Sequence, residues 1–195
     1  MAKKSRKKSS NNLARMIISL IIIAFAVLTI CTLFMSVINV TGKVGIFGFG
    51  SESTTVIKGT DIFASAFNGE VSSDLTVGAD LLVGLKTSEG AGFVTNVFIW
   101  GYILTIIVAI ASLVIGILSL LGVKFNKTSL ILGAVVVLLA LVTFIFAIVV
   151  AGKFSGDTGI EGVLSAGSTG ALAFGGYLLI ATLIGGGVQV YSTKK

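Results

Sequence analysis

Apolar residues fill four long stretches of the chain, and no charged residue interrupts them. A helix that crosses the hydrocarbon core of a bilayer needs about 20 predominantly apolar residues, because each residue adds about 1.5 Å. The uncharged stretches are residues 16–42, 90–123, 128–152 and 162–193. They predict membrane-spanning helices at residues 16–40, 93–121, 129–151 and 171–190. The second run exceeds the thickness of the core, which indicates a tilt or a projection beyond the bilayer.

The first apolar stretch follows several basic residues, as the apolar region of a secretory signal also does. Such a region is about 7–15 residues long and ends at small residues before a cleavage site. Here the apolar run continues through Leu33, Phe34 and Met35 without such a site. Cys31 could suggest a lipoprotein, but the bulky Ile30 stands where that signal has a small residue. We therefore expect a retained membrane anchor.

Residues 41–92, between the first two spans, have a different pattern. Gly alternates with apolar residues over 44–50, and β-branched residues stand between turn formers at 54–58 and 75–77. An apolar run interrupted by Gly follows at 81–86. Short alternating segments bounded by Gly, Asn, Asp and Ser are typical of strands. We expect a small twisted sheet of three or four strands.

Three further connections carry local signals. Residues 59–67 (GTDIFASAF) are compatible with a short helix that has Thr60 as N-cap and Asp61 in its first turn. Residues 152–170 are rich in Gly and Ser and contain no convincing strand. Residues 122–128 form a tight connection, which makes the second and third spans antiparallel neighbours. The predicted fold is an all-α four-helix transmembrane bundle with a small extracellular β-sheet from the first loop.

Charge predicts the orientation of the spans. The segments 1–15, 122–128 and 191–195 together carry ten basic residues and no acidic residue. The segments 41–92 and 152–170 carry four basic and eight acidic residues, which completes the net charge of +6. Lys and Arg prefer the cytoplasmic side of a membrane. We therefore expect a plasma-membrane protein with cytoplasmic termini and with both 41–92 and 152–170 outside.

Six basic residues precede the first span. They have no aromatic neighbour that could stack on a nucleic-acid base, and the apolar stretch begins directly after them. A juxtamembrane cluster of this kind sets topology and contacts anionic lipid head groups. We expect the lipid bilayer, and not nucleic acid, to be the partner of Lys3, Lys4, Arg6, Lys7, Lys8 and Arg15.

Small residues recur at helical spacing within the predicted spans. Helices in lipid associate through close packing of such residues, because hydrophobic drive between them is weak. Packing inside one chain is the favoured interpretation; a homodimer interface or a substrate path is the alternative. The triplet at 185–187 is ambiguous, since it could permit close contact or weaken the helix end. The second span carries Gly101, Thr105, Ala109, Ser112, Gly116 and Ser119; the third carries Gly133, Ala140 and Ala147; the first carries Ser19, Ala26, Thr29 and Ser36; the fourth carries Gly175, Thr182 and Gly186.

Composition narrows the possible chemistry. Of the 195 residues, 55% are hydrophobic and 11% are charged, well under the roughly 25% of soluble domains. The chain has no His, which excludes Ser-His and Cys-His pairs, and its single Cys31 lies in an apolar run. The central parts of the spans contain no ionisable residue, which argues against ion-coupled transport. A Ca²⁺ site at Asp74 and Asp80 has no recognised ligand spacing. We expect no catalytic, metal or cofactor site, and therefore no enzyme.

The order of parts resembles the claudin-like tetraspan families. Those proteins combine four helices and cytoplasmic termini with a large first external loop that forms a sheet and a shorter second loop. The claudin first-loop signature of Trp, Gly-Leu-Trp and two Cys is absent here, and the single Trp100 lies in the second span. The resemblance therefore concerns topology, and it assigns no functional residue.

Two functions remain open at this point. The first is a non-enzymatic scaffold or cell-envelope accessory protein that contacts a partner protein, or a copy of itself, through its external sheet. The second is an accessory membrane subunit of a transporter for lipid or another apolar substrate, since apolar cargo needs no buried charge. An apolar cavity between the helices would favour the second.

Overall fold

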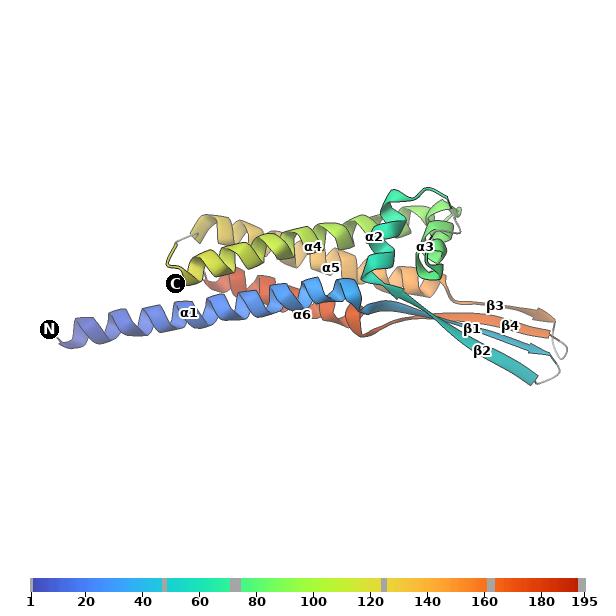
Figure 1. The fold of residues 1–195 in the computed structure, drawn as a ribbon, viewed down its shortest axis with the longest axis horizontal. Helices are drawn as coiled ribbons and strands as arrows, with labels where there is room; N and C mark the ends of the chain where they lie inside the picture. The colour runs from blue at the N-terminus through green and yellow to red at the C-terminus, as the bar shows by residue number, and fades with distance from the viewer. Residues whose placement is uncertain (1, 47–48, 71–74, 124–125, 161–163, 193–195) are drawn as a thin grey trace.

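Four long helices form a bundle, and a narrow four-stranded sheet projects from one end of it (Figure 1). The computed structural model describes residues 2–46, 49–70, 75–123, 126–160 and 164–192. We call the end with the sheet the sheet end and the other the distal end. The long helices are α1 (Ala2–Cys31), α4 (Gly92–Leu120), α5 (Asn126–Lys153) and α6 (Phe174–Ser192).

The four helices form a closed ring in which α1 and α5 each pack against α4 and α6. Large apolar side chains such as Ile107, Leu138 and Ile184 point outward and are exposed around this ring. An apolar exterior of this kind is suited to lipid. The segments long and apolar enough to cross a membrane are Leu13–Phe34, Gly92–Leu120, Lys127–Lys153 and Phe174–Ser192. The chain therefore has the features of a multi-pass integral membrane protein with four spans.

The first span ends earlier than the sequence predicted. After α1, a 3₁₀ turn η1 (Thr32–Phe34) leads into strand β1, which begins at Ser36. The prediction extended the helix to residue 40 because the apolar run continues there. Val37 and Ile38 are apolar for another reason, since both are fully buried in β1 at the base of the sheet. Hydropathy does not distinguish a lipid-facing residue from one inside a protein core.

The sheet draws two strands from each of two distant segments. Its order is β2-β1-β4-β3, and each neighbouring pair is antiparallel. Residues 152–170 were expected to contain no strand, and that prediction is wrong, because β3 and β4 lie there. The prediction that the sheet comes from the first loop alone is also wrong. The fourth span likewise begins after β4, at Phe174 rather than at residue 171. The strands are β1 (Ser36–Ile46), β2 (Phe49–Lys58), β3 (Gly156–Ile160) and β4 (Leu164–Leu172).

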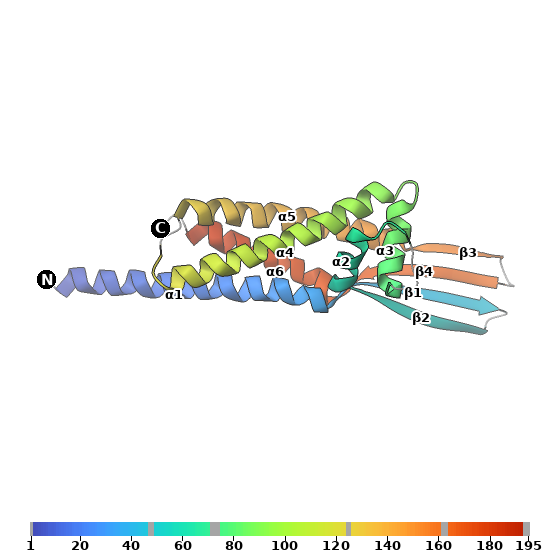
Figure 2. The same ribbon diagram turned by 45° about the horizontal axis from the view of Figure 1, so that its top comes forward.

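The helix expected at residues 59–67 is present as α2 (Gly59–Phe67). Its N-cap is Lys58 instead of Thr60, and the Asp61 carboxylate accepts a hydrogen bond from the Lys58 backbone N–H at 2.8 Å. Residues 81–86, expected as a strand, belong to α3 (Val77–Thr87). Thr76 caps α3 through the backbone N–H of Ala79. Both short helices run across the axes of the long ones (Figures 1 and 2).

A hydrophobic core lies at the sheet end, where the base of the sheet, α2 and α3 meet the long helices. Burial at this junction brings together side chains from segments far apart in the chain. The core includes Ile38, Ile57, Ile62, Leu82, Phe98, Tyr102, Val150 and Leu179. It joins the base of the sheet to the bundle.

A Schellman motif closes α4 at the distal end. Gly122 has φ +97°, a conformation that favours glycine. Its N–H donates to Ser119 O at 3.2 Å, and the Val123 N–H donates to Leu118 O at 3.1 Å. The chain then turns into α5, which packs beside α4 in the opposite direction (Figure 1).

Candidate functional site

The sheet passes from a buried base to an exposed tip. Along β1, Ile38 is fully buried and Val40 is 8% exposed, whereas Val44 is 55% exposed. Figures 1 and 2 show that the tip extends beyond every helix. The base therefore anchors the sheet, and the tip presents both of its faces and its two edge strands to the surroundings.

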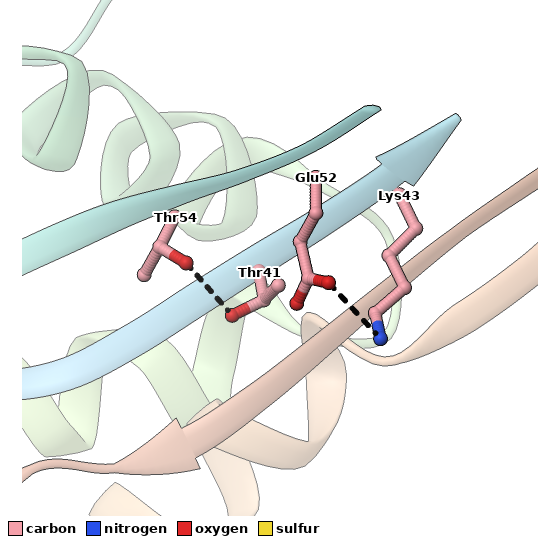
Figure 3. A network of polar contacts seen from close by, with 4 residues as sticks. All are labelled: Thr41, Lys43, Glu52 and Thr54. Atoms are coloured by element: carbon pink, nitrogen blue, oxygen red, sulfur yellow. Dashed lines mark hydrogen bonds and ion pairs between the residues drawn. The ribbon is translucent and has the colours of Figure 1, made fainter. Parts of the chain in front are cut away.

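One face of the tip carries cross-strand polar pairs, and we call it the paired face (Figure 3). Thr41 Oγ1 and Thr54 Oγ1 lie 3.3 Å apart, and Lys43 Nζ lies 3.4 Å from Glu52 Oε2. The register places each pair directly opposite across β1 and β2. The charged side chains are 63% and 56% exposed, so water screens the ion pair and its contribution to stability is small.

The opposite face of the tip is lined by smaller residues, and we call it the flat face. Register aligns Ser53, Gly42, Ser168 and Gly156 in one row across all four strands. Gly42 has space above it, since an added Cβ would meet only Ser53 atoms at 3.8 Å or more. Val44 adds an exposed apolar side chain on the same face. Among its described residues, the flat face thus carries no charged side chain and little side-chain bulk around Gly42.

The small residues predicted for α4 contact different helices at its two ends. A Cβ at Gly101 would lie 2.8 Å from Thr143 Oγ1 of α5, and a Cβ at Gly116 would lie 2.8 Å from Ile23 Cγ1 of α1. Ala109 and Ser112, between them, face the centre of the bundle. The α4 stripe therefore contacts α5 near the sheet end and α1 near the distal end.

The small residues of α5 and α6 meet each other and the sheet. A Cβ at Gly133 would lie 3.0 Å from Gly186 O, and a Cβ at Gly175 would lie 2.7 Å from Ser36 O of β1. Ala140 and Ala147 are fully buried. Of the triplet at 185–187, Gly185 packs on Phe25 and Gly186 packs on α5, whereas Gly187 has nothing within 4 Å. Two of its three members therefore permit close contact.

Hydroxyl groups pair across the helix contacts. Ser19 Oγ donates to Ser119 Oγ at 3.0 Å, linking α1 to α4. Thr29 Oγ1 and Thr182 Oγ1 lie 2.8 Å apart between α1 and α6, and Thr105 Oγ1 lies 3.2 Å from Thr143 Oγ1. Ala26 is buried beside this network. Paired hydroxyls satisfy polar atoms that have no water inside a membrane.

A small cavity lies at the centre of the bundle. Its polar lining residues are Thr29, Ser112, Thr182 and Gln189, and the rest of the lining is apolar. Ser112 Oγ and Gln189 Nε2 are buried there without a partner in the protein. The space open to the centre of a water molecule is about 10 Å³. That volume is close to the minimum for one water, and it does not accommodate an acyl chain.

Not every predicted residue is placed. Arg15 donates to the backbone carbonyl of Val123, which ties α1 to the end of α4. The side chains of Lys3, Lys4, Arg6, Lys7 and Lys8 lie outside the described part of the chain, as does Asp74.

Cys31 is a free thiol of intermediate exposure. Among the described residues, no three His, Cys, Asp or Glu side chains gather where they could hold a metal ion.

Sequence reasoning missed the polar contacts that order the two short helices. Thr76 Oγ1 donates to Asp61 Oδ1 at 2.8 Å and so joins the start of α3 to the start of α2. Lys86 Nζ donates to carbonyls at the end of α2, at 3.2 Å to Ser65, 3.4 Å to Ala66 and 3.1 Å to Asn68. The one available signal was Thr76 before an apolar segment, a common N-cap pattern.

The comparisons with known proteins return no relative. No protein-family model matches the chain, and no curated protein or solved structure is significantly similar to it. Four candidate spans are compatible with a tetraspan topology.

Proposed function

We propose that the chain is a non-enzymatic membrane protein that binds another protein, or a second copy of itself, through its projecting sheet. The observation that carries this proposal is the exposed tip of the sheet, which the core at the sheet end holds rigidly away from the bundle. A rigid, pre-ordered surface loses little entropy on binding. The claudin-like order of parts is in keeping with a scaffold role.

The flat face is the favoured contact surface. Its residues Gly42, Ser53 and Ser168 are small, which lets another surface approach closely, and Val44 supplies exposed apolar area. The paired face presents the Lys43–Glu52 ion pair, which would have to be desolvated on contact. Contact through the flat face therefore has the lower desolvation cost.

Photo-crosslinking in native membranes tests the proposal. A crosslinking side chain at Ser53 should give a discrete adduct, whereas the same group at the exposed Glu89, before α4, should not. Gly42→Arg on the flat face should remove the adduct without lowering the melting temperature, and Lys43→Gln on the paired face should leave it. No adduct at Ser53 above the Glu89 background would contradict the proposal.

We also propose that the sheet end faces outward from the plasma membrane and that both termini are cytoplasmic. The support is the excess of basic residues in the terminal segments and in the α4–α5 connection. In a Cys31→Ser background, an impermeant thiol reagent should label Ser53→Cys on intact cells. It should label Lys127→Cys only after the cells are permeabilised. The reverse labelling pattern would show that the protein has the opposite orientation in the membrane.

The second hypothesis, an accessory subunit for an apolar substrate, gains no observation in its favour. The central cavity is too small for an acyl chain, and the small residues around it pack against neighbouring helices.

A further inference from the structure

Hydrogen bonds between spans show which residues lie at the same height in the bundle. Thr32 Oγ1 lies 2.8 Å from Tyr102 OH, and Thr29 Oγ1 lies 2.8 Å from Thr182 Oγ1. From these pairs, α1 rises toward the sheet end as residue numbers increase, whereas α4 and α6 rise as they decrease.

Three exposed aromatic residues lie within about one helical turn of the same height at the sheet end. Phe34 and Trp100 each stand two residues beyond the Thr32–Tyr102 contact, and Tyr177 stands five residues beyond Thr182, as Phe34 stands five beyond Thr29. Phe34 is 74% exposed, Trp100 46% and Tyr177 56%. Aromatic side chains, Trp and Tyr above all, gather at the boundary between lipid and water.

The length below this height matches a bilayer. Trp100 and Leu120, the last residue of α4, are twenty residues apart, which corresponds to about 30 Å of helix, the thickness of the hydrocarbon core. On α1, Arg15 bonds to the Val123 carbonyl at the distal end and so marks the opposite boundary. The first two turns of α4, before Trp100, consequently stand above the hydrocarbon core.

Both ends of α2 lie close to the height of Phe34, Trp100 and Tyr177. At its start, a Cβ on Gly59 would lie 2.5 Å from Leu33 Cα and would overlap the hydroxyl group of Tyr102. At its end, the Phe67 ring meets Trp100 edge-on, with centroids 6.1 Å apart. The helix runs across the long helices (Figures 1 and 2), so it is parallel to the plane of the boundary.

Apart from Thr60 at its start, the outward side of α2 is apolar, which is unusual for a helix in water. Thr60, Phe63, Ala64 and Phe67 follow helical spacing on that side, and the 75% exposed Phe67 is its most prominent residue. The single charged residue of α2, Asp61, is buried on the other side. This is the pattern of a helix that rests in a membrane interface.

Side-chain donors satisfy backbone carbonyls at the end of α2, as a poorly hydrated environment requires. The last carbonyls of a helix have no intrahelical donor and need water or a side chain. Here Lys86 Nζ donates to the carbonyls of Ser65, Ala66 and Asn68, and Asn68 Nδ2 donates to Ala64 O at 2.7 Å. The carbonyls of Ala64, Ser65 and Ala66 therefore have protein donors in place of water.

We infer that α2 is an interfacial helix, which lies in the head-group and upper acyl region of the leaflet at the sheet end and inserts Phe67 beside Trp100. The partner of this surface is lipid. The inference concerns how the protein sits in the bilayer, and it stands whether or not the flat face binds a partner.

Trp100 is the single Trp of the chain, so its fluorescence reports its depth without any substitution. In vesicles of brominated phosphatidylcholine, bromines near the carboxyl end of the acyl chains should quench Trp100 more than bromines near the methyl end. Stronger quenching by the deep bromines, or no quenching by either lipid, would overturn the inference.

A spin label at Phe67→Cys, in a Cys31→Ser background, tests α2 directly. Val77→Cys on α3, also an exposed apolar position, is the matched control, since α3 lies nearer the tip of the sheet than α2 (Figures 1 and 2). The ratio of collisions with oxygen to collisions with a water-soluble nickel chelate should be several-fold higher at residue 67 than at residue 77. Equal ratios would place α2 in water, and exclusion of both reagents from residue 67 would show that a protein covers it; either result would overturn the inference.

Discussion

Thr29 Oγ1 and Thr182 Oγ1 are 2.8 Å apart in the interior of the bundle, where they join the first long helix to the last across 153 residues of sequence. Each hydroxyl also contacts a carbonyl one turn earlier on its own helix: Thr29 donates to Phe25 O at 2.8 Å, and Thr182 reaches Leu178 O at 3.4 Å. The contact between helices is therefore one part of a small polar network.

This pair should be energetically coupled. Thr29→Val and Thr182→Val should each lower the free energy of unfolding, and the double variant should lose less than the sum, with a coupling of about 0.6 kcal/mol. The measurement is a double-mutant cycle from equilibrium unfolding in detergent. Strict additivity would show that the two hydroxyls do not stabilise each other.

Gly116 should not tolerate a large side chain. Its Cβ would already lie 2.8 Å from Ile23 Cγ1, so Gly116→Leu must push α1 away from α4, and we expect a loss of about 1–3 kcal/mol. Gly187→Leu is the control, because Gly187 has nothing within 4 Å on the outside of α6. Thermal unfolding in detergent compares them. Equal melting temperatures for both variants would mean that Gly116 does not face a packed contact.

Gly170 of β4 should be the most sensitive of the sheet glycines whose surroundings the structure describes. An added Cβ would overlap the backbone carbonyl of Ala151, at the end of α5, and backbone cannot rotate aside as a side chain can. Gly170→Ala should therefore lower the melting temperature in detergent by several degrees, whereas Gly42→Ala on the open flat face should change it little. Similar losses in both variants would contradict this contact.

The stability of the sheet should depend on its buried base and not on the Lys43–Glu52 ion pair. Ile38→Ala removes a fully buried side chain from the core and should cost about 2–5 kcal/mol. Lys43→Ala breaks the exposed pair with Glu52 and should cost about 0.2–1 kcal/mol. Denaturant titrations of the two variants provide the comparison. A Lys43→Ala loss as large as that of Ile38→Ala would overturn this account of the sheet.

The sequence by itself determined the features that depend on local composition. Four apolar stretches predicted four long helices, and α4 starts and ends within one residue of its expected span. The short helix at residues 59–67 was also predictable, because its signal lies within nine consecutive residues. In these segments, the requirement to satisfy the backbone in lipid, or a local cap, is sufficient to select the structure.

Only the tertiary structure decided how the sheet is built. The residues of β4 are mostly Gly, Ala, Ser and Thr, with no apolar alternation, and they become a strand because β1 pairs with them along its length. Val37 and Ile38 looked like the continuation of a span, but they are buried in β1 at the base of the sheet. The height shared by Phe34, Trp100 and Tyr177 likewise follows from contacts between helices. Such pairings join residues 70 or more positions apart. Local sequence cannot specify them, because their energy exists only once both partners are in place.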